Sequence, residues 1–239
     1  MAILVSFLHD FLSLIFPELC GACSRNLIKG EDQICVSCLY KLPYTNFHQD
    51  RDNRLARQFW GRVELVQAGA FLHFKKGGRT QRLLHEIKYK KRQELGKRMG
   101  ELYGQQLAES SIFIKPDLII PVPLHPKKLK LRGYNQSACI AEGLSLALDI
   151  PVSINTLCRN LHTETQTRKS RFARYENMQE AFVLTDGDCL RGLWLGRQSW
   201  LAVIHSSIQV SAPKGRCTEL AGRGVTDRRS AAPGPIRRA

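Results

Sequence analysis

The chain has 239 residues, which fits one domain plus a small module at about 100 to 200 residues per domain. Its hydrophobic fraction of 43% and charged fraction of 24% are ordinary for a globular protein, so a mainly disordered or collagenous chain is excluded. The formal net charge of +15 predicts a polyanionic partner, but it does not choose among nucleic acid, a phosphorylated small molecule and an anionic membrane.

The first 16 residues are apolar enough to raise the question of a signal peptide, but they lack a basic start and a small-residue cleavage site. No stretch reaches the roughly 18 uninterrupted apolar residues of a membrane span. We therefore expect a cytoplasmic protein. Helical spacing predicts that this segment is an amphipathic helix ended by Pro17, with an apolar face of Phe7, Phe11, Leu14 and Ile15.

Four of the eight cysteines form two C-x-x-C pairs separated by eleven residues: Cys20, Cys23, Cys35 and Cys38. Two such pairs can hold one tetrahedral zinc through four thiolates, and a site filled by four cysteines is structural rather than catalytic. The alternatives are a redox pair or chance spacing, but a redox motif needs one pair only, in a strand-to-helix setting that is absent here. The sequence thus predicts a zinc ribbon.

Residues 63–74 have a strand pattern, and a long helical stretch follows it. Within that stretch Leu83, Leu84 and Ile87 form one apolar patch. A second patch comes after a basic run at 88–92 and consists of Leu95, Met99, Leu102 and Tyr103. A basic run of this kind is more often a solvated helix end than a binding site.

Asp117-Leu-Ile-Ile-Pro-Val-Pro is a short apolar run typical of a buried parallel strand. A basic loop over 124–136 and a helix capped by Asn135 or Ser137 are expected after it. A strand, a basic loop and a helix N-terminus together make a generic anion site. The alternative is an ordinary solvated loop, and composition alone does not decide between them.

Residues 159–177 are polar and carry no turn signals, as in a disordered segment or a functional lid. Ala181-Phe-Val-Leu then has the pattern of a strand. With these motifs, residues 12–190 resemble the ComF (ComFC) family, which joins a zinc ribbon to a type I phosphoribosyltransferase-like domain. The resemblance rests on the cysteines, Ile87-Lys-Tyr, Asp117-Leu-Ile-Ile-Pro-Val-Pro-Leu-His, Arg132-Gly-Tyr-Asn-Gln and the lid residues Thr163, Thr165, Gln166, Arg174 and Asn177.

The resemblance implies an α/β fold, with a parallel sheet and flanking helices that bind 5-phosphoribosyl-1-pyrophosphate (PRPP) and Mg²⁺. The lid would exclude water from the reacting sugar carbon, and cations rather than a nucleophile would stabilise the leaving pyrophosphate. His125 is expected to make a structural hydrogen bond rather than to transfer a proton. The implied pyrophosphate and PRPP residues are Lys88, His125, Lys127, Lys128, Arg132, Gly133 and Asn135, and the implied lid residues are Thr165, Gln166, Arg174 and Asn177.

One element of such enzymes is missing: a strand ending in two acidic residues, followed by a Thr- and Gly-rich loop that holds the ribose and its 5′-phosphate. No acidic residue occurs between Asp188 and Glu219. The composition also changes near residue 191, because all ten Phe and all six Tyr precede it, whereas eight Arg and a single Lys follow it. The segment 200–205 is the one candidate for a substitute strand.

Two explanations of residues 191–239 stay open: a genuine basic tail that binds a polyanion, or translation in a shifted reading frame; we favour the second. The predicted division is 1–55 for the N-terminal helix and zinc ribbon, 56–190 for an incomplete phosphoribosyltransferase-like domain, and 191–239 for an atypical tail. Transferase activity is expected to be lost or impaired, and the domain to be unstable without its middle strand. The alternative function is DNA handling in competence, through single-stranded DNA and competence proteins.

Overall fold

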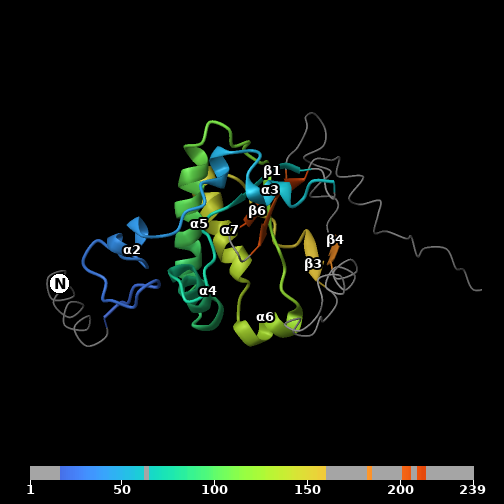
Figure 1. Cartoon of the computed structure of the whole chain (residues 1–239). Coiled ribbons are helices and arrows are strands. Elements are labelled where there is room, and N and C mark those ends of the chain that lie inside the picture. The colour runs from blue at the N-terminus through green and yellow to red at the C-terminus, as the bar shows by residue number, and fades with distance from the viewer. Residues whose placement is uncertain (1–16, 62–64, 160–181, 185–200, 206–208, 214–239) are drawn as a thin grey trace, which may run out of the picture.

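The computed structural model describes residues 17–61, 65–159, 182–184, 201–205 and 209–213. They form a mixed helix-and-strand structure (Figure 1). The helices are α2 (Val36–Tyr40), the 3₁₀ turn η1 (Phe47–Gln49), α3 (Arg54–Arg57), α4 (Arg79–Tyr89), α5 (Gln93–Ala108), α6 (Pro126–Arg132) and α7 (Gln136–Leu148). The strands are β1 (Leu65–Ala70), β2 (Leu118–Pro121), β3 (Leu157–Arg159), β4 (Phe182–Leu184), β5 (Leu201–His205) and β6 (Gln209–Pro213).

The main sheet has four strands in the order β1-β6-β5-β2. Strand β2 is buried along its length and pairs in parallel with β5, with Ile119 opposite Ala202. Strand β6 is antiparallel to both β5 and β1, and β3 and β4 form a separate antiparallel pair. The mixture of helices and strands agrees with the sequence prediction. The expected parallel sheet is not seen, because among these strands only β2 and β5 pair in parallel.

The two middle strands of the main sheet come from the segment that the sequence marks as atypical. Residues 201–205 and 209–213 lie between β1 and β2, where they supply hydrogen bonds to both outer strands. The proposed substitute strand at 200–205 is therefore confirmed as β5, and the expectation of a sheet without its middle strand is wrong. A run of β-branched and apolar residues, Leu-Ala-Val-Ile, fits that central place.

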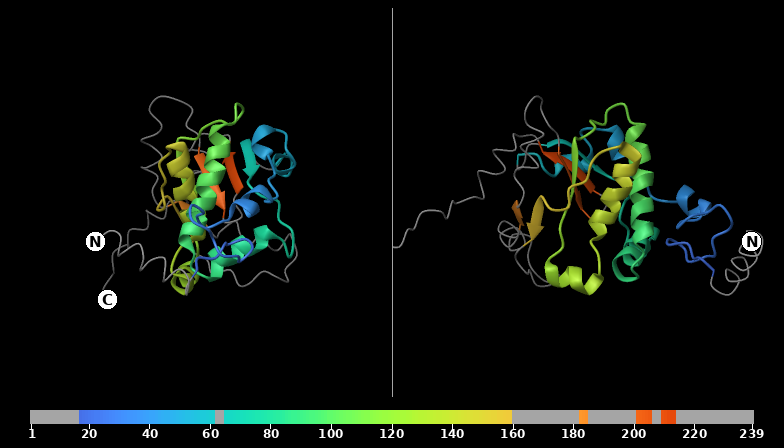
Figure 2. Two further views of the ribbon diagram at one scale, coloured as in Figure 1. Left: turned by 90° about the vertical axis from the view of Figure 1, so that its left-hand side faces the viewer. Right: turned by 180° about the vertical axis from the view of Figure 1, so that it is seen from behind.

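Helices α5 and α7 pack side by side against one face of the sheet (Figure 2). Their contact is close because α5 carries glycine at every fourth position: Gly96, Gly100 and Gly104. A Cβ atom on Gly100 would collide with the Ile140 carbonyl of α7, and one on Gly143 would collide with the Lys97 carbonyl of α5. The core between helices and sheet contains Leu95, Met99, Tyr103, Ile140 and Leu144, all almost fully buried.

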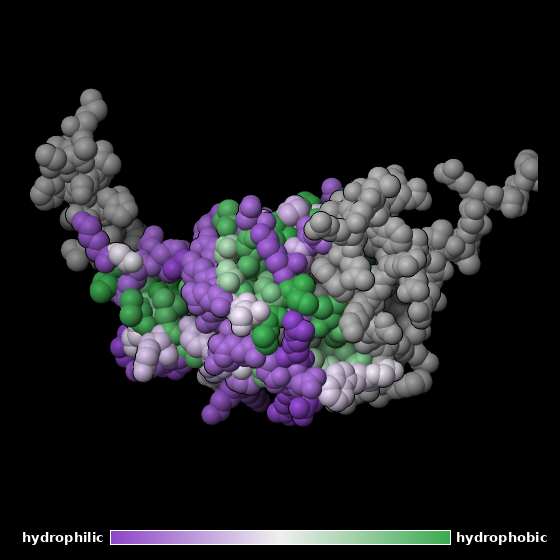
Figure 3. Space-filling model, turned by 90° about the horizontal axis from the view of Figure 1, so that it is seen from above, coloured by the Kyte–Doolittle hydropathy of each residue, from purple (hydrophilic) through white to green (hydrophobic). Residues whose placement is uncertain are grey.

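The cysteine-containing module packs onto the start of α5, at the left of Figure 1. Ala22, Ile34 and Leu42 join the same hydrophobic cluster as Leu83 and Ile87 of α4. Seen from above, hydrophobic patches of this module and of the larger body are separated by hydrophilic residues (Figure 3).

The expected long helical stretch is two helices, α4 and α5, separated by the basic run. Lys91 has φ +56 in this connection, a left-handed conformation that cannot continue a helix. The expected basic loop after β2 is also different, because most of it forms α6. Pro126 starts that helix at a position where its missing N–H costs nothing, and Gly133 ends it with φ +83.

Two predicted elements, the amphipathic helix before Pro17 and the lid at 160–177, lie outside the described residues. Of the lid stretch, Arg159 is described and is the last residue of β3. Within the part of the chain that the structure covers, no helix has the length and apolar character needed to cross a membrane.

Candidate functional site

The four predicted zinc ligands lie together in space. The sulfur atoms of Cys20, Cys23, Cys35 and Cys38 are all within 4.8 Å of one another. The first pair sits on a tight turn in which the Ser24 amide donates to the Cys20 carbonyl. Cys35 is the residue that precedes α2, so the second pair spans the first turn of a helix and directs both sulfurs to the same point.

The electrostatics of the cluster favour a bound cation. Burial alone would raise the pKa of Cys20, but hydrogen bonds from the Cys35, Ala22 and Cys23 amides and the Cys23 thiol outweigh it and lower the pKa to about 7. Burial and the neighbouring sulfurs raise the pKa of Cys38 to about 12. Four thiols this close cannot all ionise without a positive charge between them.

The geometry fits zinc. Four sulfurs at about 2.3 Å from a tetrahedral zinc lie about 3.8 Å from one another. The Cys23 and Cys35 sulfurs are 3.8 Å apart, and the Cys35 amide donates to the Cys20 sulfur over 3.3 Å. The cluster is therefore compatible with structural zinc, as the spacing predicts. Since cysteine fills every position, a metal here would hold the fold together rather than activate water.

A second cluster joins two motifs that are far apart in the sequence. Tyr134 donates a hydrogen bond to the carbonyl of Ile87 in the last turn of α4. The Arg132 guanidinium lies 5.8 Å from the ring centroid of Tyr89, in the range of a cation–π contact. The Ile87-Lys-Tyr and Arg132-Gly-Tyr-Asn-Gln motifs thus form one site.

Lys88 and Arg132 give this site its charge. Partial burial, together with the nearby Arg132 charge, lowers the pKa of Lys88. Neither side chain forms an ion pair with an acidic residue of the described part; Arg132 instead donates to the Gln136 amide oxygen over 3.0 Å. Two cations held together and partly desolvated make a place where a bound anion is favourable.

The N-terminus of α7 completes the same site. Asn135 caps this helix by accepting from the Ser137 amide over 3.0 Å, as the sequence predicts. Its Nδ2 donates to the Val122 carbonyl over 3.1 Å, which fixes the loop to the end of β2. Backbone N–H groups at a helix start attract anions, and here they follow directly after Arg132.

The other predicted residues are less central. His125 is buried and caps α6, with Nδ1 accepting from the Lys127 amide over 3.2 Å, which is the structural hydrogen bond expected for it. Lys128 lies one turn before Arg132 on α6, so the two share a face, whereas Lys127 and Gly133 are exposed. Four predicted lid residues lie outside the described residues: Thr165, Gln166, Arg174 and Asn177.

Tyr134, Tyr89 and Gln136 also belong to this site, although the sequence pattern does not predict their roles. Tyr134 and Gln136 are buried and connect the motif to α4 and Arg132, while Tyr89 offers an exposed ring. The motif letters were visible in the sequence, but spacing alone could not pair two segments separated by more than 40 residues. The regular glycines of α5 were a further unused signal.

Comparison with known proteins finds relatives that match parts of this chain. The chain is 44% identical to Competence protein F of Haemophilus influenzae over 69 residues, 29% of this chain and 30% of that protein. It is 31% identical to DNA utilization protein YhgH of Salmonella typhimurium over 105 residues, 43% of this chain and 46% of that protein. With YhgH of Escherichia coli O157:H7 it shares 28% identity over 170 residues, 70% of each chain.

The chain thus spans less than half the length of the first two of these relatives. No family model matches it. No solved structure matches it significantly either. The resemblance to the ComF family is nevertheless confirmed, as partial identity to homologues that carry competence and DNA-utilization names.

Proposed function

We propose that the site formed by Lys88, Arg132 and the start of α7 binds the pyrophosphate of PRPP, with Mg²⁺. The observation that supports this most directly is the pairing of Lys88 with Arg132, two cations held together without an acidic partner in the described part. Arg132 suits a phosphate group because its planar fork donates two parallel hydrogen bonds. Lys128 adds a third charge on the same helix face.

In an intact relative such a site would stabilise departing pyrophosphate during phosphoribosyl transfer. This chain lacks the acidic pair and the Thr- and Gly-rich loop that would hold the sugar and its 5′-phosphate. Strand β5 stands beside β2 in the sheet, but its sequence ends in His205 and continues with Ser206-Ser207. The proposed site is therefore a half-site, which binds pyrophosphate but lacks the part that would hold the sugar and its 5′-phosphate. It should have little or no transferase activity.

Calorimetric titration with inorganic pyrophosphate and with PRPP, both with Mg²⁺, tests this proposal. A half-site should bind the two ligands with similar affinity, and Arg132→Gln should weaken both about tenfold or more. Lys130→Gln is the matched control, because Lys130 is an exposed cation on the same helix. Absence of any binding would refute the site, and micromolar PRPP binding far tighter than that of pyrophosphate would refute the half-site.

A second function is favoured by one feature of the same region. The Tyr89 side chain is 64% exposed, with His85 4.9 Å from its ring and Arg132 over its face. An exposed aromatic ring with an arginine over its face is typical of surfaces that stack single-stranded bases. The relatives named for DNA utilization agree with a DNA-related role.

Binding of a fluorescent single-stranded oligonucleotide, measured over a series of salt concentrations, tests this second function. A steep salt dependence and a loss of affinity in Tyr89→Ala would support it. The Tyr40→Ala variant is a suitable control, since Tyr40 is also an exposed tyrosine and lies on the cysteine module. Equal losses in both variants would argue against a site at Tyr89.

A further inference from the structure

A separate pocket lies beside the Lys88 site. It has a volume of about 400 Å³, which is within the usual range for small-molecule sites of roughly 300 to 1,000 Å³. Three segments form its walls: the chain after the cysteine module (45–58), the end of β1 with the residues that follow it (70–74), and α4. Lys88 lines it from the α4 side and also feels the charge of Arg132.

The lining has a definite chemistry. Its ionisable residues are Arg54, His73 and Lys88, and none of its described members is acidic. Half of the lining residues are apolar, and they include two phenylalanines, Phe47 and Phe74. The rings of Phe47 and His73 meet edge to face, with centroids 5.6 Å apart. Aromatic walls with cations and without carboxylates suit a ligand that is both flat and negatively charged.

The walls are also held in place by buried hydrogen bonds. Asn53 is 3% exposed, and its Nδ2 lies 2.7 Å from the Ala68 carbonyl of β1 and 3.1 Å from the Phe47 carbonyl. Its Oδ1 accepts from the Leu55 amide, so this single side chain fixes Phe47 and α3 against the sheet. Thr80 donates to the His73 carbonyl over 2.9 Å, which ties α4 to the segment that follows β1.

We propose that this pocket binds a planar aromatic anion, with its ring against Phe47 and Phe74 and its acidic group at Arg54 and Lys88. The preformed walls reduce the entropy that a ligand would lose on binding. An anion would also relieve the unfavourable partial burial of the Lys88 charge. The pocket shares Lys88 with the proposed pyrophosphate site, but it does not depend on that function.

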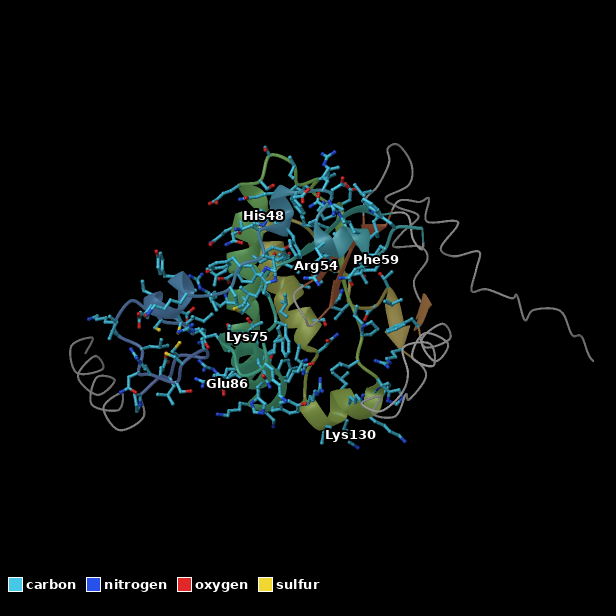
Figure 4. All side chains as sticks on the ribbon, viewed as in Figure 1. His48, Arg54, Phe59, Lys75, Glu86 and Lys130 are labelled. Atoms are coloured by element: carbon cyan, nitrogen blue, oxygen red, sulfur yellow. The ribbon has the colours of Figure 1, made fainter. Side chains whose placement is uncertain are left out.

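Arg54 provides the position for a test, since it lines the pocket, lies on the surface and is remote from α6. Figure 4 shows Arg54 on α3 and Lys130 on α6 at well-separated places in the structure. Arg54→Gln should therefore fold normally and leave pyrophosphate binding unchanged. Arg57→Gln removes a charge from the same short helix outside the pocket, and serves as the matched control.

The probes are 1-naphthoate, an aromatic carboxylate, and adenosine 5′-monophosphate, a heteroaromatic phosphate, each followed by calorimetry and by NMR line broadening. Ligands of this size are expected to bind with dissociation constants of about 1 mM or tighter. Arg54→Gln should weaken the affinity for the probe that binds about tenfold, while Arg57→Gln and Arg132→Gln should change this affinity by less than about threefold. Binding of 1-naphthoate would indicate a carboxylate ligand, and binding of adenosine 5′-monophosphate would indicate a nucleotide.

The neutral analogue 1-naphthalenemethanol should bind at least about tenfold more weakly than 1-naphthoate, because it cannot use the two cations. Equal affinity would overturn the proposed role of charge. Absence of binding by both anionic probes, or binding that Arg54→Gln does not weaken, would overturn the site itself. A loss in Arg132→Gln as large as in Arg54→Gln would place the probe in the pyrophosphate site and refute a separate pocket.

Discussion

The Tyr134 hydroxyl donates to the Ile87 carbonyl, a hydrogen bond that connects residues 47 positions apart in the chain. Both residues are buried, at 8% and 1% exposure. The carbonyls of a last helical turn have no partner within the helix, so this bond satisfies a group that would otherwise be buried unpaired. It also sets the position of Lys88 relative to Arg132.

Tyr134→Phe should lower the free energy of unfolding by about 1 to 3 kcal/mol, because the Ile87 carbonyl stays buried without its donor. The variant should also bind pyrophosphate more weakly, since the two motifs are no longer held in register. Urea unfolding and calorimetry measure the two effects. An unchanged unfolding midpoint would show that the hydrogen bond contributes nothing to the fold.

Tyr103→Phe is expected to give the opposite result. The Tyr103 ring stacks on Phe71 with centroids 5.0 Å apart, but its buried hydroxyl has no hydrogen-bond partner within the described residues. Removing a buried polar group without a partner relieves a desolvation cost. The variant should be as stable as the parent or slightly more stable in urea. A loss as large as that of Tyr134→Phe would reveal a partner for this hydroxyl.

Alkaline pH should destabilise the protein in a way that Tyr134 partly controls. Burial and nearby Cys139 raise the pKa of Tyr134 to about 12, although Arg132 opposes them. An unfolded tyrosine ionises near pH 10, so the unfolded chain loses this proton first as the pH rises from about 10 to 12. The contribution of protonated Tyr134 to the free energy of unfolding is therefore complete below pH 10. It is lost as the pH rises through this window, by up to about 1.4 kcal/mol per pH unit.

Tyr134→Phe should accordingly show a shallower fall in stability over the same window, measured by urea unfolding at several pH values. The difference between the two proteins isolates Tyr134, because other groups with shifted pKa values, including Lys88, are present in both. Parallel curves for the parent and the variant would contradict the shifted pKa of Tyr134.

Local sequence signals predicted the local structure well. The cysteine spacing, the strand at 118–121 and the Asn135 cap each depend on a few neighbouring residues, and the structure agrees with all three. The sequence predicts a loop where the structure has α6, because several lysines follow one another there. The start signal at Pro126 and the stop signal at Gly133 are nevertheless ordinary helix boundaries.

The sequence does not predict which distant segments contact one another. The sequences of β5 and β6 do not reveal that these strands lie between β1 and β2, because a strand pattern does not identify the neighbouring strands. The same limit applied to the site: Lys88 and Arg132 were both predicted, but their proximity depends on Tyr134 reaching α4. The contact of α5 with α7 likewise depends on glycines whose neighbours lie on another helix.

Gly100→Ala should destabilise the protein strongly. The new methyl group would collide with the Ile140 carbonyl, which is backbone of a packed helix and cannot move aside alone. We expect a loss of about 3 kcal/mol or more, at the upper end for overpacking, although alanine favours a helix over glycine. Gln105→Ala is the control, because Gln105 is exposed on the same helix. Thermal unfolding compares them, and equal midpoints would show that α5 and α7 are not in close contact.

Each chain should bind one zinc ion, and Cys38→Ser should abolish this binding. Since Cys35 and Cys38 have raised pKa values, each must release a proton when zinc binds near neutral pH. Titration in buffers of different ionisation enthalpy should therefore show release of at least about two protons. Elemental analysis measures the stoichiometry. Cys139→Ala is the matched control, because Cys139 is a buried cysteine outside the cluster and should leave the zinc content unchanged.

Loss of zinc should also destabilise the larger domain, because the cysteine module is not an independent appendage. Ala22 and Ile34 share the hydrophobic cluster with Leu83, and a Cβ on Gly21 would lie 2.6 Å from the Leu95 side chain. When the module opens, this apolar surface becomes exposed to water. A chelator should thus lower the melting temperature of the parent and leave that of Cys38→Ser unchanged. If the chelator removes zinc while the melting temperature stays constant, the module and the domain are energetically separate.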